Sequence, residues 1–427
     1  MINIINRLRG AYLVILCGIV FITSCNKELE QFTPIATPVY PTGNGIAATI
    51  AANANYSFYN ALITRAGLAP SLNDLTKTFT LFATDNAGMK VFVNAASGGA
   101  VPLAAPDATF LGFISGSLPV ASAQAIIQYN TIGQKFTSAS FGSAFPNYPL
   151  PSQIVLDPSQ PFVRMPIFPA KGTPYSYVNT IPITGADIAA ANGVIIPTFT
   201  IVAPPQRVMW ERINTDADLT IFKAAIARAD SGTITAKEPL GVLVGALSNG
   251  GANFTVFAPT NLAMKQLLSA LTGIPVAAPD ANFIGFLASN FISTRLVKGI
   301  VVYHIFDGRS NTLSAAVITK RPGRVFTNNI PAADSVNRTL LSSADSIGIT
   351  YPGVAISATY SGLLVIAAKV KGNVNPTASN IIINFTPDIL PSYGSTPPAS
   401  PITYVGTSDQ NYVNGIIHKI DQVLRPQ

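Results

Sequence analysis

The chain repeats blocks of its own sequence, and this duplication limits the folds it can adopt more than any other feature. Residues 79–90 read FTLFATDNAGMK, and 175 positions later residues 254–265 read FTVFAPTNLAMK. A second pair follows in the same order: residues 105–114 read APDATFLGFI, and residues 278–287 read APDANFIGFL. Blocks that recur in one order at a nearly constant distance indicate two copies of one structural unit. We therefore expect two domains of the same fold.

Further matches predict the elements of each copy. An apolar run at 126–130 matches 300–304, where we expect a strand that ends in Tyr-His, and the Asn-Gly turn and strand at 192–196 match 414–418. Each first block alternates like a strand and is followed by an asparagine suited to starting a helix. Upstream, apolar residues spaced i, i+3, i+7, i+10 predict one buried helix face in each copy. These residues are Tyr56, Tyr59, Ile63 and Ala66 in the first copy, and Leu219, Phe222, Ile226 and Ala229 in the second.

Together these blocks resemble the fasciclin-like domain family. The second copy matches closely, with FTVFAPTNLAM at 254–264, Tyr303-His304, and NGIIHKIDQVLRP at 414–426. The first copy is divergent, because Asn130 replaces His304 and Ile196 replaces His418. The resemblance implies an α+β fold in which a β-sandwich or wedge is packed with short helices. It also marks six motif residues as structural or binding: Asn261, Tyr303, His304, Asn414, Gly415 and His418.

We place the first repeat at residues 43–205 and the second repeat at 208–427. The second repeat is longer, and the surplus falls in an insertion at about 314–411. Insertions on a shared scaffold often carry specificity, although a surface loop without function is the alternative. The short junction, APPQRVMWERINTD at 203–216, contains the only tryptophan, Trp210. If it is partly buried, it would restrict movement between the two domains.

The N-terminus resembles that of a bacterial lipoprotein. Arg7 and Arg9 precede an apolar core at 11–22, which is too short to span a bilayer as a helix. Ile22-Thr23-Ser24 then precedes Cys25, as in a lipobox. This implies a signal peptide at 1–24, lipidation at Cys25 and a tether at 25–42. An ordinary signal peptide with an incidental cysteine is the alternative.

The predicted location is therefore the cell envelope, with the lipid in the outer membrane of a Gram-negative bacterium. Charged residues directly after Cys25, at 27–30, resemble the sorting signals that bring some lipoproteins to the cell surface. Both the periplasmic and the outer leaflet stay open. Cleavage before Cys25 removes Cys17 and acylation consumes the remaining thiol, so the folded part would lack an intrachain disulfide.

Candidate chemistry is sparse. The whole chain holds two histidines, His304 and His418, and no HExxH motif, nucleophile elbow or phosphate-binding glycine loop. A hydrolase that uses His304 or His418 as an acid or base is a weaker hypothesis, because Asp421 would lie on the opposite face of a strand from His418. We expect no catalytic residue, no metal ion and no cofactor. We assign Asp107 and Asp280 to helix N-caps.

Charge also limits the function classes. Charged residues make up 11 % of the chain, and the formal net charge is +7. The densest basic cluster, KRPGR at 320–324, is interpreted as a solvated loop, so nucleic acid is not an expected partner. The leading hypothesis is a lipid-anchored adhesion protein whose partner is an extracellular protein or a glycan. The alternative is an accessory substrate-binding lipoprotein of an outer-membrane nutrient-import complex.

Overall fold

The computed structural model describes residues 39–142, 148–172, 175–231, 243–307, 324, 326, 335–337, 364–366, 409–420 and 423. By its internal contacts the chain divides into two units, Met1–Tyr40 and Pro41–Gln427. The predicted signal peptide, Cys25 and almost all of the tether lie outside the described residues, as does most of the insertion. The domain boundaries at 43–205 and 208–427 stay predictions.

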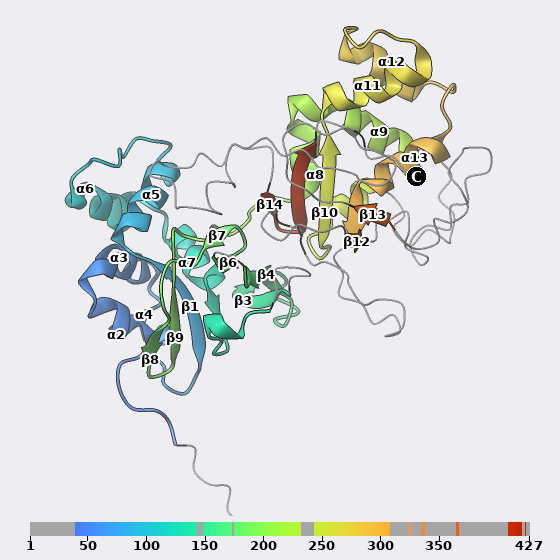
Figure 1. Ribbon diagram of the computed structural model, residues 1–427. Coiled ribbons are helices and arrows are strands. Elements are labelled where there is room, and N and C mark those ends of the chain that lie inside the picture. The colour runs from blue at the N-terminus through green and yellow to red at the C-terminus, as the bar shows by residue number, and fades with distance from the viewer. Residues whose placement is uncertain are drawn as a thin grey trace, which may run out of the picture. The chain divides into compact units, whose positions relative to one another are not determined.

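A mixed six-stranded sheet forms the centre of the first repeat (Figure 1), in the order β4-β3-β2-β1-β9-β8. Its strands are β1 (Phe79–Thr84), β2 (Thr131–Ile132), β3 (Leu150–Val155), β4 (Arg164–Ile167), β8 (Ile188–Ala190) and β9 (Gly193–Thr198). The central pair, β1 and β9, is parallel, with Phe79 opposite Gly193 and Thr84 opposite Thr198. Every other neighbouring pair in this sheet is antiparallel.

The two faces of this sheet bury different layers. Leu81 and Ile195 join a core made largely by helices, whereas Phe82 and Ile196 join a second core. That second core includes residues of the small sheet β5-β6-β7. The helices are α2 (Ile46–Ala51), η1 (Ala54–Tyr56), α3 (Ser57–Ala66), α4 (Ala69–Leu72), α5 (Asn86–Ala96), α6 (Asp107–Gly112), η2 (Phe113–Ser117), α7 (Val120–Tyr129) and η3 (Ser138–Ser140). The small sheet comprises β5 (Pro169–Ala170), β6 (Tyr177–Val178) and β7 (Ile181–Pro182). The expected α+β class is confirmed.

The second repeat builds the same central sheet from four strands, in the order β11-β10-β15-β14. These strands are β10 (Phe254–Pro259), β11 (Ile305–Asp307), β14 (Gln410–Tyr412) and β15 (Gly415–Ile420). The parallel pair β10–β15 keeps the register of β1–β9, because Phe254 lies opposite Gly415 as Phe79 lies opposite Gly193. A separate hairpin, β12 (Ser335–Asn337) with β13 (Leu364–Ile366), belongs to the insertion.

The helices of the second repeat enclose a core of their own. They are α8 (Met209–Thr215), η4 (Ala217–Leu219), α9 (Thr220–Asp230), α10 (Leu243–Ser248), α11 (Asn261–Thr272), α12 (Asp280–Ala288) and α13 (Thr294–Tyr303). Trp210 packs half-buried against this core. All eight residues of the two predicted helix faces are buried. Six of them lie on α3 and α9, as predicted, whereas Tyr56 and Leu219 end the preceding 3-10 helices η1 and η4. Val256 and Ile416 are also fully buried, as the repeat requires.

Three local predictions were wrong. Residues 300–303 end the helix α13, and only residue 305 begins a strand. The helix wins over the β-branched run because Ser293 caps its start and because Val297 and Val301, one turn apart, are both buried. The helices do begin at the predicted asparagines, Asn86 and Asn261, but the side chain that caps α11 is that of Thr260. Asp107 and Asp280 likewise follow the N-cap positions, which are prolines.

Within the described residues, no single helix is long and apolar enough to cross a membrane. One bent pair, Asp107–Ser117 with Val120–Tyr129, passes on length and composition alone.

Candidate functional site

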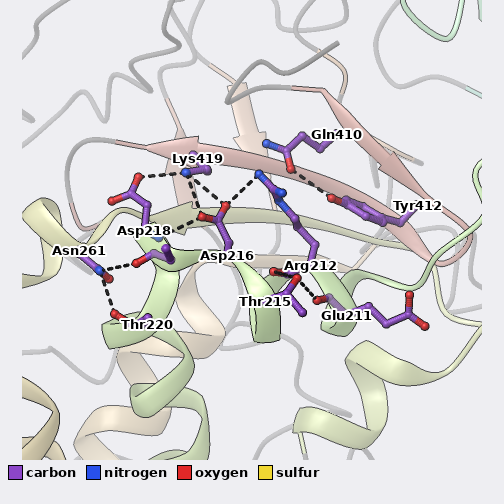
Figure 2. Close-up of polar contacts among 11 residues, drawn as sticks. Glu211, Arg212, Thr215, Asp216, Asp218, Thr220, Asn261, Gln410, Tyr412 and Lys419 are labelled. Carbon is purple, nitrogen blue, oxygen red and sulfur yellow. Dashed lines mark hydrogen bonds and ion pairs between the residues drawn. The ribbon is translucent and has the colours of Figure 1, made fainter. Parts of the chain in front are cut away.

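Asn261 joins three helices of the second repeat. Its Oδ1 accepts the backbone N–H of Ile221 at 3.0 Å, and its Nδ2 donates to the carbonyl oxygen of Ala217 at 3.0 Å. Nδ2 also lies 2.8 Å from Thr220 Oγ1 and 2.6 Å from Asp280 Oδ2. Figure 2 shows Asn261 beside Thr220. The amide thus satisfies backbone groups at the start of α9 and holds α11 and α12 against it.

The first repeat makes the same junction with Asn86. Its Oδ1 accepts the N–H of Phe58 at 3.0 Å, and its Nδ2 donates to the carbonyl oxygen of Ala54 at 3.0 Å. The nearby ion pair is repeated too, with Lys90 and Asp107 at 2.7 Å in the first repeat. Its counterpart in the second repeat is Lys265 with Asp280 at 2.5 Å. Because both copies use the asparagine in one way, its primary role is structural.

Asn414 and Gly415 connect the last hairpin to the first helix of the second repeat. Asn414 is fully buried, accepts the N–H of Met209 at 2.9 Å and donates to the carbonyl oxygen of Leu247 at 2.7 Å. In the first repeat Asn192 accepts the N–H of Ile46 at 2.9 Å and donates to the carbonyl oxygen of Leu72 at 2.9 Å. The predicted turn into a strand at this position is confirmed.

His304 follows α13 and is fully buried. Its Nδ1 lies 2.7 Å from the carbonyl oxygen of Ile300, and since that oxygen can only accept, Nδ1 carries the proton. Burial lowers the pKa of His304 to about 4, so the imidazole is neutral near pH 7. In the first repeat Asn130 Nδ2 donates to the carbonyl oxygen of Ile126 at 2.8 Å. Asparagine therefore replaces histidine with the same hydrogen bond.

His418 lies on β15 and is also fully buried. Its ring stacks on Phe257, with 5.2 Å between the centroids, and its Nδ1 accepts the backbone N–H of Asp409 at 3.0 Å. The Asp409 carboxylate lies 3.9 Å from the same nitrogen, with 5 % of its side chain exposed. Neither imidazole is exposed to solvent, so a substrate could not reach either without local opening.

Three other positions named in the sequence analysis cannot be built into a site. Tyr303 is the last residue of α13, but its side chain lies outside the described residues, as does the whole of Asp421. Cys25 also falls outside them. The proposed roles of Tyr303 and Cys25 stay predictions.

A charged cluster that sequence reasoning missed joins β15 to the start of the second repeat (Figure 2). Lys419 Nζ lies 3.2 Å from Asp216 Oδ2 and 3.0 Å from Asp218 Oδ2, and Arg212 lies 3.0 Å from Asp216. Burial alone would raise the pKa of Asp216, but the N–H of Asp218 and the charges of Lys419 and Arg212 lower it below its usual value. The two positive and two negative charges neutralise one another, and they link β15 to the residues that begin the second repeat.

The first repeat carries no such charges at the matching positions. Asn53 stands in place of Asp216 and caps η1 in the same way, through a hydrogen bond from the N–H of Asn55 at 3.1 Å. Pro197 stands in place of Lys419. The signal that could have revealed the cluster was this change from neutral to charged residues between the aligned copies.

Arg324 overturns the prediction of a solvated basic loop at 320–324. Its side chain is 1 % exposed, and its guanidinium donates to Asn253 Oδ1, Asn411 Oδ1 and the carbonyl oxygens of Tyr412 and Val413 at 2.7–2.8 Å. Burial lowers the pKa of Arg324 to about 10, which leaves it charged at neutral pH. The hydrogen bonds compensate for the lost hydration. Residues 320–323 lie outside the described residues.

The described residues contain no group of three or more histidine, cysteine, aspartate or glutamate side chains that could hold a metal ion. The described motif side chains instead bond to backbone groups in the interior. Whether the protein is catalytic is not tested by this geometry, and the expectation of a protein without catalysis, metal or cofactor stays a prediction.

Comparisons with known proteins add one distant likeness. No family model matches the chain, and no curated protein matches it either. Among solved structures, the chain is similar to a FAS1 domain pair from the insect cell adhesion molecule Fasciclin I. The sequence identity is 12 %, and the match covers 86 % of this chain and 95 % of that one. The TM-score is 0.28, which is too low to carry an argument. The resemblance to fasciclin-like domains therefore rests on the sequence blocks.

Proposed function

We propose that this protein is a lipid-anchored binding or adhesion protein of the cell envelope, built from two fasciclin-like domains and without catalytic activity. One observation carries the proposal: motif residues that could be mistaken for an active site serve the scaffold. Asn261, His304 and Asn414 each bond to buried backbone groups, and Asn86, Asn130 and Asn192 do so at the matching positions. Because these motif residues hold the interior together, we assign partner recognition to the outer surface and the insertions of the scaffold.

The buried histidines argue against the hydrolase hypothesis. A general base must come within hydrogen-bond reach of its substrate, and both imidazoles are 0 % exposed. The Nδ1 atoms of His304 and His418 are also engaged with backbone groups. The proposed partner is an extracellular protein or a glycan. Because the anchor would hold many copies on one surface, weak contacts could add up to firm attachment.

The anchor is tested by changing Cys25 to Ser. We expect the parent to sediment with the envelope and to incorporate labelled palmitate, and Cys25→Ser to be soluble and unlabelled, because the acylated sulfur is lost. Cys17→Ser is the matched control and should behave like the parent. Cys25→Ser protein that still sediments without detergent would show that the anchor is not at this residue.

The binding role is tested by removing residues 367–408 from the insertion, which leaves Arg324, Asn411 and the β14–β15 hairpin in place. We expect cells displaying the shortened protein to lose at least about tenfold in attachment to arrayed matrix proteins or glycans, as when the centre of an interface is removed. The urea unfolding curve should change little. Unchanged attachment would move the binding surface elsewhere, and absence of attachment by the parent would contradict the adhesion proposal.

A further inference from the structure

The insertion of the second repeat contributes two described side chains to the interior, and both touch the first repeat. Phe326 is fully buried in a cluster with Ile416 of β15 and Phe168, which follows β4. The rings of Phe168 and Phe326 meet edge to face, with 5.6 Å between their centroids. Arg324 Cζ lies 5.2 Å from the centroid of the same Phe168 ring. The Phe168 ring therefore contacts both the Phe326 ring and the Arg324 guanidinium.

On its other side Arg324 is fixed to the β14–β15 hairpin. Nη1 and Nη2 donate to the carbonyl oxygens of Tyr412 and Val413, which are adjacent in the chain. The side chains of Asn253 and Asn411 accept two further bonds. A planar guanidinium can bond along its edge while its face lies on an aromatic ring, which a lysine ammonium cannot reproduce. The geometry is therefore specific for arginine.

The acceptors belong to the second repeat alone. The first repeat has Thr78 at the position of Asn253 and Ala189 at the position of Asn411. The two copies share the asparagines Asn86 with Asn261 and Asn192 with Asn414, whereas this second pair of asparagines accompanies the arginine. The hydrogen bonds of Arg324 to Asn253 and Asn411 are therefore particular to the second repeat.

Phe168 is held as firmly as Arg324. Its backbone N–H donates to Asn179 Oδ1 at 2.9 Å, and its carbonyl oxygen accepts the N–H of Asn179 at 2.8 Å. Asn179 is buried, with a positive φ of 53°, and its Nδ2 donates to the hydroxyl of Tyr129 at 3.1 Å. Val413 of the hairpin also packs against the core that contains Tyr129. Phe168 and the hairpin thus meet through Arg324, Phe326 and Ile416.

We propose that Arg324 couples the two repeats, by linking Phe168 of the first to the β14–β15 hairpin of the second, so that they unfold as one cooperative unit. Removing the guanidinium would remove four hydrogen bonds to partly buried acceptors and the cation that lies over the Phe168 ring. The inference goes beyond the proposed function and does not depend on it.

The test uses the full chain in detergent and Trp210 fluorescence, which reports on the second repeat alone. Leu62→Ala opens a cavity in the helical core of the first repeat, where Leu62 is fully buried. In the parent we expect it to lower the Trp210 midpoint by roughly 1 M urea. In the Arg324→Gln background we expect Leu62→Ala to shift the Trp210 midpoint by no more than about a third of the shift seen in the parent. The combination of the two changes forms a double-mutant cycle.

Two variants keep the test decisive. Phe168→Ala removes the ring but keeps the four hydrogen bonds of Arg324 within the second repeat, and it should uncouple the repeats as Arg324→Gln does. It also serves as the test if Arg324→Gln fails to fold. Arg164→Gln is the matched control, because Arg164 bonds to the carbonyl oxygen of Gln153 on its own hairpin at 3.1 Å, and it should preserve the shift. If Leu62→Ala does not shift the Trp210 unfolding midpoint in the parent, the proposed coupling of the two repeats is wrong. An equal shift in the Arg324→Gln and Phe168→Ala backgrounds overturns the role of this contact, as would loss of the shift in Arg164→Gln.

Discussion

Replacing Gly415 with alanine is expected to destabilise the second repeat by roughly 3 kcal/mol or more. A Cβ at this position would lie under 3.0 Å from the carbonyl oxygen of Phe254 and 2.5 Å from Met209 Sδ. The oxygen belongs to the strand that pairs directly with Gly415, and Met209 is held by Asn414. The flexible Met209 side chain can turn away, but the carbonyl oxygen of Phe254 cannot withdraw without breaking the pairing of β10 with β15, so the backbone contact sets the cost. Urea unfolding followed by Trp210 fluorescence measures the loss.

The matched control is Gly285→Ala, since a Cβ at this exposed position in α12 meets nothing within 4 Å. It should leave the unfolding midpoint unchanged or raise it slightly, because alanine favours a helix. Gly193→Ala should damage the first repeat as Gly415→Ala damages the second, since its Cβ would meet the carbonyl oxygen of Phe79. A Gly415→Ala variant as stable as Gly285→Ala would contradict the steric argument.

These junction residues could be predicted from the sequence because the chain holds two copies of them. Asn192-Gly193 and Asn414-Gly415 recur while most of the surrounding residues differ, and the physical reason is visible in both. The asparagine must satisfy an N–H and a carbonyl oxygen in the interior, and the glycine must let two backbones approach. Requirements of this kind tolerate few substitutions, so their signal survives in a single sequence.

Acid is expected to weaken the second repeat through His304. The pKa of this buried imidazole is lowered to about 4 in the folded chain, from a usual value of 6.5. Between these values the unfolded chain takes up a proton that the folded chain does not. The contribution is therefore fully present above pH 6.5 and is lost as the pH falls toward 4, by about 3 kcal/mol in the free energy of unfolding. Urea unfolding at pH 7 and pH 4, followed through Trp210, measures this difference.

His304→Asn is the matched variant, because Asn130 already fills this position in the first repeat with the equivalent hydrogen bond. It should remove most of the loss between pH 7 and pH 4, while His418→Ile, which copies Ile196, should leave the part due to His304. Carboxylates titrate in the parent and in both variants. The test therefore compares the loss of unfolding free energy between pH 7 and pH 4 from one protein to the next. If His304→Asn loses as much stability as the parent, the imidazole is not excluded from protonation as its burial requires.

Features that depend on partners far apart in the sequence could not be predicted. Lys419 meets Asp216 across 203 positions, and Arg324 meets Asn411 across 87. A basic run such as 320–324 looks solvated until its acceptors are known. The strand expected at 300–304 failed for a related reason, since an apolar β-branched run suits a strand or a buried helix equally. The choice was made by the cap at Ser293 and by the packing of α13.

The parallel pairing of β10 with β15 has a consequence for how the protein is made. Phe254 pairs with Gly415, which lies 161 residues later in the chain. Contacts this remote slow folding, because a long loop must close before they form. A polypeptide that emerges from its N-terminus therefore cannot form the central pair of its second sheet until residue 415 and the rest of β15 have been made. Any product cut short before β15 lacks the pair on which its central sheet is built.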